Sequence, residues 1–214
     1  MLVIAIDVGG PEKIGWAASD GRSGSGRDLG EVLTTAATLL SGGEGVAIGF
    51  ESPIWTPRRE EMGRITGRRG GAETFFNRAW SAGAGCGVLA AGLGLMPWCF
   101  TQIAGQTAER RATTIPSTFE ETGGGLFVWE AFVSGAAKAA THMDDASLAL
   151  AAFQARSLDQ PSDIPAESAV NLAVAALLAT GWQVGPHEIG QAGHVVAVGL
   201  ADAIAVIPAL SSHS

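Results

Sequence analysis

The chain has 214 residues, of which 47% are hydrophobic and 16% are charged. This length suits one α/β domain with a sizeable core, and we expect a single domain over residues 1–214. The formal net charge of −8 argues against broad, non-specific binding of nucleic acid, although a local basic groove stays compatible with it.

The two cysteines, Cys86 and Cys99, are too few and too far apart for a zinc site or a disulfide framework. A reducing cytoplasm is therefore the expected location. The start of the chain lacks the basic region and the long apolar run of a signal peptide. The uncharged stretch 79–103 is long enough to span a membrane. Its many glycines, Pro97 and its polar residues instead favour a small-residue helix buried in the core of a soluble protein.

In chain order, an apolar run from Leu2 predicts a central strand that is buried on both faces and carries Asp7 at its end, before two glycines. Later elements follow from hydrophobic spacing and from glycine or proline breaks. They are an antiparallel strand over 13–19, a helix over 31–40, a strand over 46–51, a helix over 81–95, a strand-like and then helical segment over 98–114, a strand over 126–132, helices over 142–156 and 168–180, and closing strands over 194–199 and 203–207.

Three of the predicted core strands carry an acid: Asp7, Glu51 and Glu130. A lone buried carboxylate is costly unless a partner neutralises it, and a divalent cation is the simplest such partner. Hard cations prefer oxygen ligands, so Asp and Glu without Cys or His suit them. If these acids form one site, their carboxylates should lie about 4–8 Å apart.

Residues 53–80 interrupt the pattern and are predicted to form a basic insertion after the Glu51 strand; long loops of this kind are commonly functional or mobile. Aromatic residues interleave with arginines there, as a surface for phosphates and unpaired bases requires. A solvated loop whose aromatic residues cover the core explains the pattern equally well. The arginines predicted to bind substrate are Arg58, Arg59, Arg64, Arg68, Arg69 and Arg78.

The order of strands, helices and acids resembles the ribonuclease H-like superfamily, in particular its Holliday-junction-resolvase-like branch of predicted nucleases. The resemblance rests on the short motifs IAIDVG (4–9), IGFESP (48–53) and VWE (128–130), and on the predicted helix that begins near Glu167. It covers roughly residues 1–182. It implies a mixed central sheet flanked by helices, and hydrolysis of phosphodiester bonds with two Mg²⁺ or Mn²⁺ ions.

Under this resemblance, Asp7 would bridge both ions, Glu51 and Glu130 would each hold one, and Glu167 would complete the catalytic and metal-binding site. Asn171, one helical turn after Glu167 in the predicted helix, stands where many relatives carry an acid. This departure puts full metal occupancy, and hence activity, in question.

The acids also have structural explanations. Asp7 suits the turn before two glycines, and Glu51 could be a solvated strand end. Glu167 in the first turn of a helix is expected from the helix dipole alone. Asp144 and Asp145 are interpreted first as the start of a helix, and they are the reserve ligands if Glu167 does not take part.

Three functions stay open at this stage. The first is a metal-dependent nuclease, or a degenerate relative of one, with nucleic acid as partner and no membrane association. The second is an actin-like or sugar-kinase-like nucleotide-binding domain, whose first strand also ends in Asp-x-Gly, although 214 residues leave room for only one of its two domains. The third is a non-catalytic domain that forms a homodimer or binds another protein, with Glu130 facing the core and no cation nearby.

Overall fold

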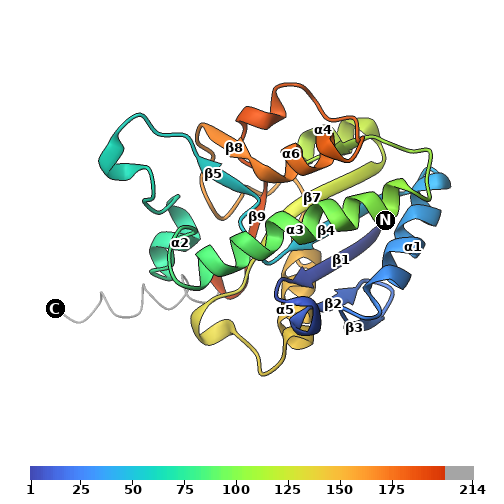
Figure 1. Ribbon diagram of the computed structural model, residues 1–214, viewed down its shortest axis with the longest axis horizontal. Coiled ribbons are helices and arrows are strands. Elements are labelled where there is room, and N and C mark those ends of the chain that lie inside the picture. Colours follow the sequence, from blue (N-terminus) through green and yellow to red (C-terminus); the bar gives the residue numbers. More distant parts are fainter. Residues whose placement is uncertain (201–214) are drawn as a thin grey trace.

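The computed structural model describes residues 1–200, and a mixed sheet of seven strands forms its centre (Figure 1). In spatial order the sheet contains β3 (Ser23–Ser25), β2 (Gly15–Ala18), β1 (Leu2–Asp7), β4 (Gly45–Phe50), β7 (Gly125–Phe132) and β6 (Ala112–Thr113), and β9 (Val195–Ala197) also pairs with β7. The α-helices are α1 (Leu29–Ser41), α2 (Gly71–Phe75), α3 (Ala84–Ala104), α4 (Pro116–Thr122), α5 (His142–Gln154) and α6 (Leu172–Ala179).

Both strand directions occur in the sheet. β1 runs antiparallel to β2 and parallel to β4, and β7 runs parallel to β4, β6 and β9. Helices cover both faces of this sheet. The predicted α/β class, with a mixed central sheet flanked by helices, is therefore confirmed.

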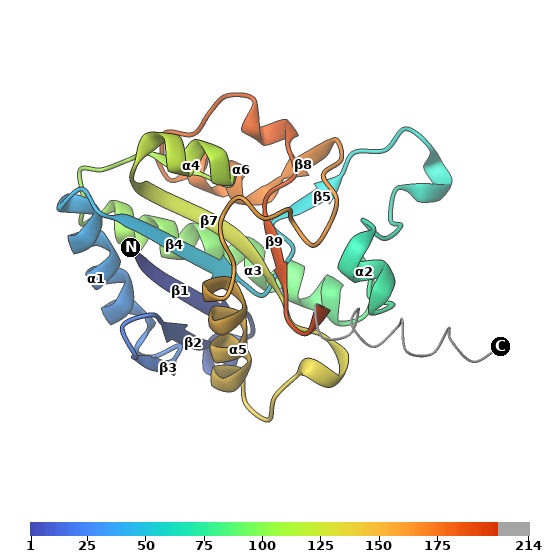
Figure 2. The same cartoon turned by 180° about the vertical axis from the view of Figure 1, so that it is seen from behind.

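Alternate residues of the strands face opposite sides of the sheet, and each side has its own apolar core. Ile4 and Ile6 of β1 face the side that is covered by α1, α3 and α6. Val3 and Ala5 face the other side, where α4 and α5 lie (Figure 2). Because the central strands are buried on both faces, they appear as continuous apolar runs in the sequence.

Several predicted elements are present. α1 and α5 lie where helices are predicted, β2 is the antiparallel return of the first strand, and β9 corresponds to the predicted strand over 194–199. The predicted strand over 203–207 lies outside the described residues. Two assignments are wrong: residues 98–104 continue α3 as a helix, and residues 169–171 form a strand, so the last helix begins at Leu172.

Within residues 1–200, α3 is the one helix that is long and apolar enough to cross a membrane, with a mean hydropathy of 1.4 over its most apolar window. Here it packs across the sheet through Met96, Phe100 and Ile103. The rings of Phe100 and Phe50 are arranged edge-to-face, with their centroids 5.8 Å apart. Only 22% of that window is buried, so the helix is less enclosed than the sequence analysis predicts.

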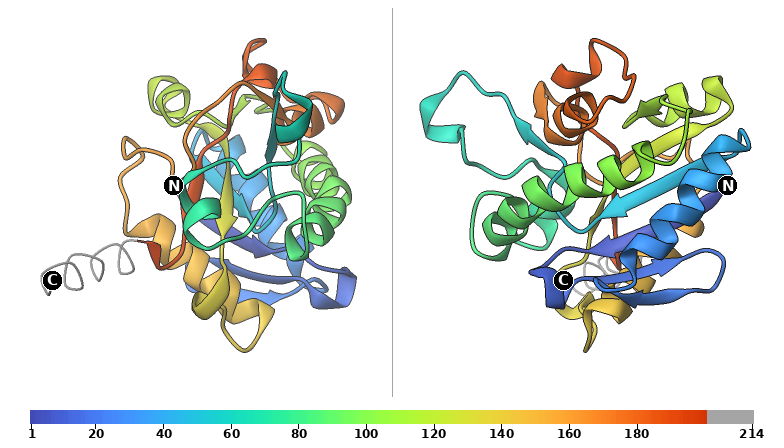
Figure 3. Two further views of the ribbon diagram at one scale, coloured as in Figure 1. Left: turned by 90° about the vertical axis from the view of Figure 1, so that its left-hand side faces the viewer. Right: turned by 45° about the vertical axis from the view of Figure 1, so that its right-hand side comes forward.

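The basic insertion begins at the C-terminal end of β4 and contains more regular structure than a loop. Its first strand, β5 (Trp55–Pro57), pairs antiparallel with β8 (Ala169–Asn171) in a two-stranded ribbon outside the main sheet. The chain between β5 and α3 projects from the body of the molecule and includes the short helix α2 (Figure 3). This pairing explains why residues 169–171 are extended, since their backbone groups bond to β5.

Candidate metal centre

Two acids come together at the C-terminal edge of the parallel strands. Asp7 is the last residue of β1, and Glu51 directly follows β4. Ile6 lies opposite Phe50 in the parallel ladder, and the amide of Glu51 donates to the carbonyl of Ile6 at 2.8 Å. Asp7 and Glu51 are therefore neighbours on the same face of the sheet, the face that α5 covers.

Asp145, in the first turn of α5, adds a third carboxylate. One carboxylate oxygen from each of Asp7, Glu51 and Asp145 lies within 4.8 Å of the others, and all three residues are buried. We call these three residues the acid cluster. α5 reaches this position because β2 presents a glycine to it: a Cβ atom at Gly15 would lie 2.3 Å from the carbonyl carbon of His142.

Lys138, in the loop before α5, neutralises part of the acid cluster. Its Nζ lies 2.8 Å from Oε1 of Glu51 and 3.1 Å from Oδ2 of Asp145. The amide of Ala139 donates to Oδ1 of Asp145 at 2.7 Å, and Nδ1 of His142 contacts Oδ2 of Asp7. Within residues 1–200, the three carboxylates of the acid cluster thus have one lysine and one histidine as their basic partners.

One oxygen of Glu51 has no partner among the described residues. Oε2 is buried and accepts no hydrogen bond, in a residue that is only 8% exposed. The pKa of Glu51 is raised to about 9, first by burial and then by the neighbouring carboxylate of Asp7, while Lys138 opposes the rise. The cluster is therefore short of positive charge at neutral pH, and a bound cation would supply it.

The ligand chemistry of the acid cluster fits a hard divalent cation. Its potential ligand atoms are carboxylate oxygens, and they come from three separate elements of the fold. Such oxygens suit magnesium, manganese and calcium, whereas thiolates and imidazoles suit zinc. The buried, unpartnered oxygen of Glu51 is the atom that a cation would satisfy most directly.

Glu130 does not join the acid cluster, contrary to the expectation from the sequence. Phe50 lies opposite Glu130 in the ladder, so Glu130 faces the side of the sheet opposite to that of Glu51. The carboxylate of Glu130 accepts two bonds from Arg69, at 2.6 and 2.8 Å, and one from the amide of Ile54 at 3.0 Å. With 1% exposure, Glu130 is an internal counter-ion of Arg69 and not a ligand in this cluster.

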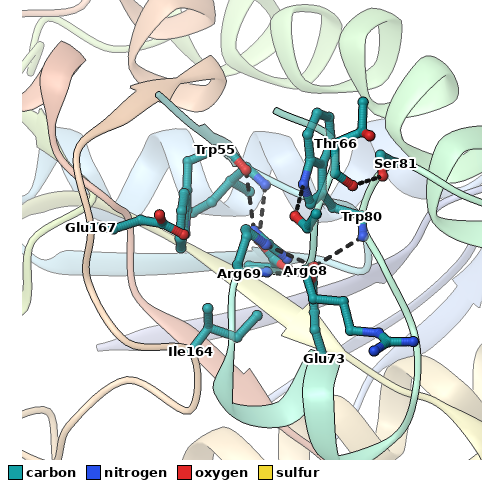
Figure 4. A network of polar contacts seen from close by, with 12 residues as sticks. Trp55, Thr66, Arg68, Arg69, Glu73, Trp80, Ser81, Ile164 and Glu167 are labelled. Atoms are coloured by element: carbon teal, nitrogen blue, oxygen red, sulfur yellow. Dashed lines mark hydrogen bonds and ion pairs between the residues drawn. The ribbon is translucent and has the colours of Figure 1, made fainter. Parts of the chain in front are cut away.

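Arg69 is correspondingly unable to bind substrate, because it is 3% exposed and fully engaged. Besides Glu130, its Nε donates to Oε1 of Glu73 at 2.8 Å, and its guanidinium lies 4.6 Å from the ring centroid of Trp55 (Figure 4). These contacts join the basic insertion to β7. Arg69 is therefore a structural residue of the insertion.

Glu167 is likewise an ion-pair partner, and not a member of the acid cluster. It accepts bonds from Arg59 at 2.8 and 3.1 Å, and it precedes β8 instead of opening a helix. Asn171 is consequently not one helical turn away from it. Asn171 caps α6, and its Oδ1 accepts a hydrogen bond from the amide of Val174 at 3.0 Å, so a capping role accounts for its amide side chain.

The other four arginines of the basic insertion are exposed. Arg58 and Arg78 form no ion pair with the described residues. Arg64 lies 3.9 Å from Glu61 in a solvent-exposed pair, and Arg68 hydrogen-bonds a neighbouring side-chain amide. These four side chains are free enough to contact an anionic ligand, whereas Arg59 and Arg69 are not.

Neither Lys138 nor His142 is predicted at the site from the sequence, and Asp145 is predicted there only as a reserve ligand. Lys138 and His142 follow β7 and flank the start of α5, a segment in which the sequence shows no ligand spacing. The usable signal was the pair of acids in the first turn of a predicted helix. The sequence does not show on which face of the sheet this helix packs, and that face decides whether Asp145 reaches the other acids.

Comparison of the chain with protein-family models, with curated proteins and with solved structures found no match.

Proposed function

We propose that this protein is a divalent-cation-dependent phosphodiester hydrolase that cuts nucleic acid and has a ribonuclease H-like fold. The observation that carries the proposal is the convergence of Asp7, Glu51 and Asp145 within 4.8 Å, beside a buried and unpartnered oxygen of Glu51. Mg²⁺ or Mn²⁺ is the proposed cofactor, because both accept carboxylate oxygens and both support phosphoryl chemistry.

The topology supports the fold assignment. The antiparallel unit β3-β2-β1 continues into the parallel strand β4, and β7 follows on the far side of β4. The resemblance implies acids from the first strand, from a middle strand and from the last helix. Asp7 and Glu51 occupy the first two of these places, and Asp145 of α5, which precedes the last helix α6, is proposed as the helical acid in place of Glu167.

Each residue near the cluster has a separate task in the proposed reaction. The three carboxylates would hold the cation, which would supply an activated water and positive charge for the leaving oxygen. His142 holds the carboxylate of Asp7 in place through its Nδ1 contact. While no cation is bound, Lys138 contacts Glu51 and Asp145, and its ammonium group offsets the charge of Asp145.

Nucleic acid is the proposed substrate because positive charge gathers at one place in an otherwise acidic chain. The exposed arginines of the basic insertion can contact phosphates bidentately, whereas the net charge of −8 disfavours binding elsewhere on the surface. A cytoplasmic location and a homodimer also stay predictions. The free thiols of Cys86 and Cys99 are compatible with that location.

The test is a nuclease assay on single-stranded, duplex and branched DNA and RNA, with Mg²⁺ or Mn²⁺ and with EDTA as the metal-free control. We expect cutting that requires the cation and that Asp7→Asn abolishes. Asp144→Asn, which changes an exposed acid of the same helix, should cut like the wild type. Unchanged cutting by Asp7→Asn would reject the site, and Mn²⁺ binding without any cutting would favour the non-catalytic reading.

A further inference from the structure

A cavity adjoins the acid cluster at the C-terminal edge of the parallel strands. Its volume is about 210 Å³, and it lies between the ends of β4 and β7, the start of α3 and the loop before α5. Glu51 and Lys138 belong both to its wall and to the acid cluster or its immediate contacts. Open α/β sheets bind their ligands at this edge, outside the carboxyl ends of the strands.

The wall of the cavity combines apolar, cationic and acidic groups, and two of its acids, Glu73 and Glu130, are paired with Arg69. Trp80, Val88 and Phe132 supply apolar surface, and Arg78 is an exposed guanidinium without an ion pair among residues 1–200. The indole of Trp80 is fixed, because its Nε1 donates to the carbonyl of Gly67 at 3.2 Å and its amide donates to Glu73 at 3.1 Å (Figure 4). A fixed aromatic ring is the element on which unpaired bases stack.

The first two turns of α3 also contribute to this wall, through Ala84, Gly85 and Val88. No side chain caps this helix of 21 residues. The positive end of its dipole therefore adds to the positive charge that Arg78 brings to this wall. A ligand that suits this wall has an anionic part and a flat apolar part, as a nucleotide does.

We propose that this cavity receives one unpaired nucleotide of the substrate strand, with its base against Trp80 and Phe132 and its phosphate toward Arg78. This inference rests on the proposed function and names its substrate class as single-stranded nucleic acid. Sites for drug-sized ligands measure about 300–1,000 Å³, so a cavity of about 210 Å³ accepts a single base and excludes a base pair. A duplex would first have to unpair and unstack the entering nucleotide.

The experiment measures binding and not cutting, on the full chain in EDTA. The probe is a fluorescent single strand of about eight nucleotides, or the same strand in a duplex, followed by anisotropy. Val88→Trp and Ala84→Trp fill the cavity from α3, and Ala84 is exposed, so the second variant keeps the core intact. Ala90→Trp adds the same side chain to an exposed position of α3 outside the wall and is the matched control.

We expect the wild type and Ala90→Trp to bind the single strand more tightly than the duplex, and both filled variants to bind it about tenfold more weakly. Arg78→Gln should weaken binding and reduce the slope of log affinity against log salt by about one. Wild-type affinity in both filled variants, or equal affinity for the duplex, would overturn the proposal.

The outcomes for the two proposals are separable. Cavity-dependent binding of single strands with no cation-dependent cutting would keep this inference and reject the hydrolase. Cation-dependent cutting that is lost in Asp7→Asn but unchanged in both filled variants would do the reverse.

Discussion

The ammonium group of Lys138 lies 2.8 Å from Oε1 of Glu51, one of the carboxylates that could hold a cation. The same ammonium reaches Asp145 at 3.1 Å, and the side chain of Lys138 is 44% exposed. A lysine on a loop, half in solvent, can leave these acids when a better cation arrives. We therefore expect metal binding and the Lys138 contacts to be mutually exclusive.

Replacing Lys138 by Met should strengthen Mn²⁺ binding by roughly fivefold, because the cation no longer competes with a charge–charge contact of about 1 kcal/mol. The metal-free variant should also melt at a lower temperature, since its carboxylates are less balanced. Titration calorimetry with Mn²⁺ and thermal melts in EDTA measure the two effects. Lys13→Met, at the other, exposed lysine, is the control, and unchanged or weaker Mn²⁺ binding in Lys138→Met would contradict the expectation.

Asp145→Asn should weaken Mn²⁺ binding by about 10- to 100-fold, because it removes one charged ligand but keeps the hydrogen bond from Ala139. The fold should be retained, since an amide oxygen can still accept that bond. Asp144→Asn is the matched control, as Asp144 is exposed and, among residues 1–200, its side chain hydrogen-bonds only the cap residue Thr141. Equal losses in the two variants would show that the helix start matters and that the third ligand does not.

The pH dependence of stability should reveal Glu51. Its pKa is about 9 in the folded protein against 4.5 for the ordinary carboxyl, so between these values the folded state holds a proton that the unfolded chain has lost. The stabilisation from Glu51 is complete below pH 4.5 and is lost as the pH rises toward 9.

The melting temperature of the metal-free protein should therefore fall as the pH rises from 4.5 toward 9. Glu51→Gln should make this decline less steep, because glutamine stays neutral. Glu60→Gln, an exposed acid of the basic insertion, should leave the decline as it is. Addition of Mn²⁺ at neutral pH should release protons from the wild type but fewer from Glu51→Gln. A decline of the same steepness in Glu51→Gln would exclude this residue as its source.

Arg69→Met should destabilise the fold by about 3–5 kcal/mol, because it leaves Glu73 and Glu130 buried without their counter-ion. For a chain of this length such a loss lowers the melting temperature by on the order of 10 °C. Arg58→Met, at an exposed arginine without an ion pair among the described residues, should change the free energy of unfolding by about 0.5 kcal/mol or less. Urea unfolding of both variants measures the change in the free energy of unfolding. Equal changes in the two variants would refute the structural role given to Arg69.

The strands and their acids could be found in the sequence, but the face that each acid occupies could not. In the ladder, Ile6 lies opposite Phe50, which lies opposite Glu130. Asp7 and Glu51 are thus in register, whereas Glu130 is one residue out of register. Because side chains alternate along a strand, one residue is enough to move an acid to the other face. Strand register depends on pairing between distant segments, which apolar runs do not encode.

The two helix errors have local physical causes. Ala169 and Val170 are apolar and lie just before helical sequence, so spacing alone does not separate a strand from a longer helix. Their extended form depends on the partner β5, more than a hundred residues earlier in the chain. Pro97 suggests a break in α3, yet the helix continues through it to Ala104. In both places contacts with distant segments outweigh local preference.

The bare backbone of Gly15 determines how deeply α5 can settle onto the neighbouring strand. A methyl group there would act as a spacer that lifts the first turn of the helix and takes its aspartate out of reach of the other two carboxylates. A search for related chains should therefore require a glycine eight positions after the first aspartate, as well as the acids themselves. A homologue that kept every acid but had lost this glycine would be expected to have lost its metal.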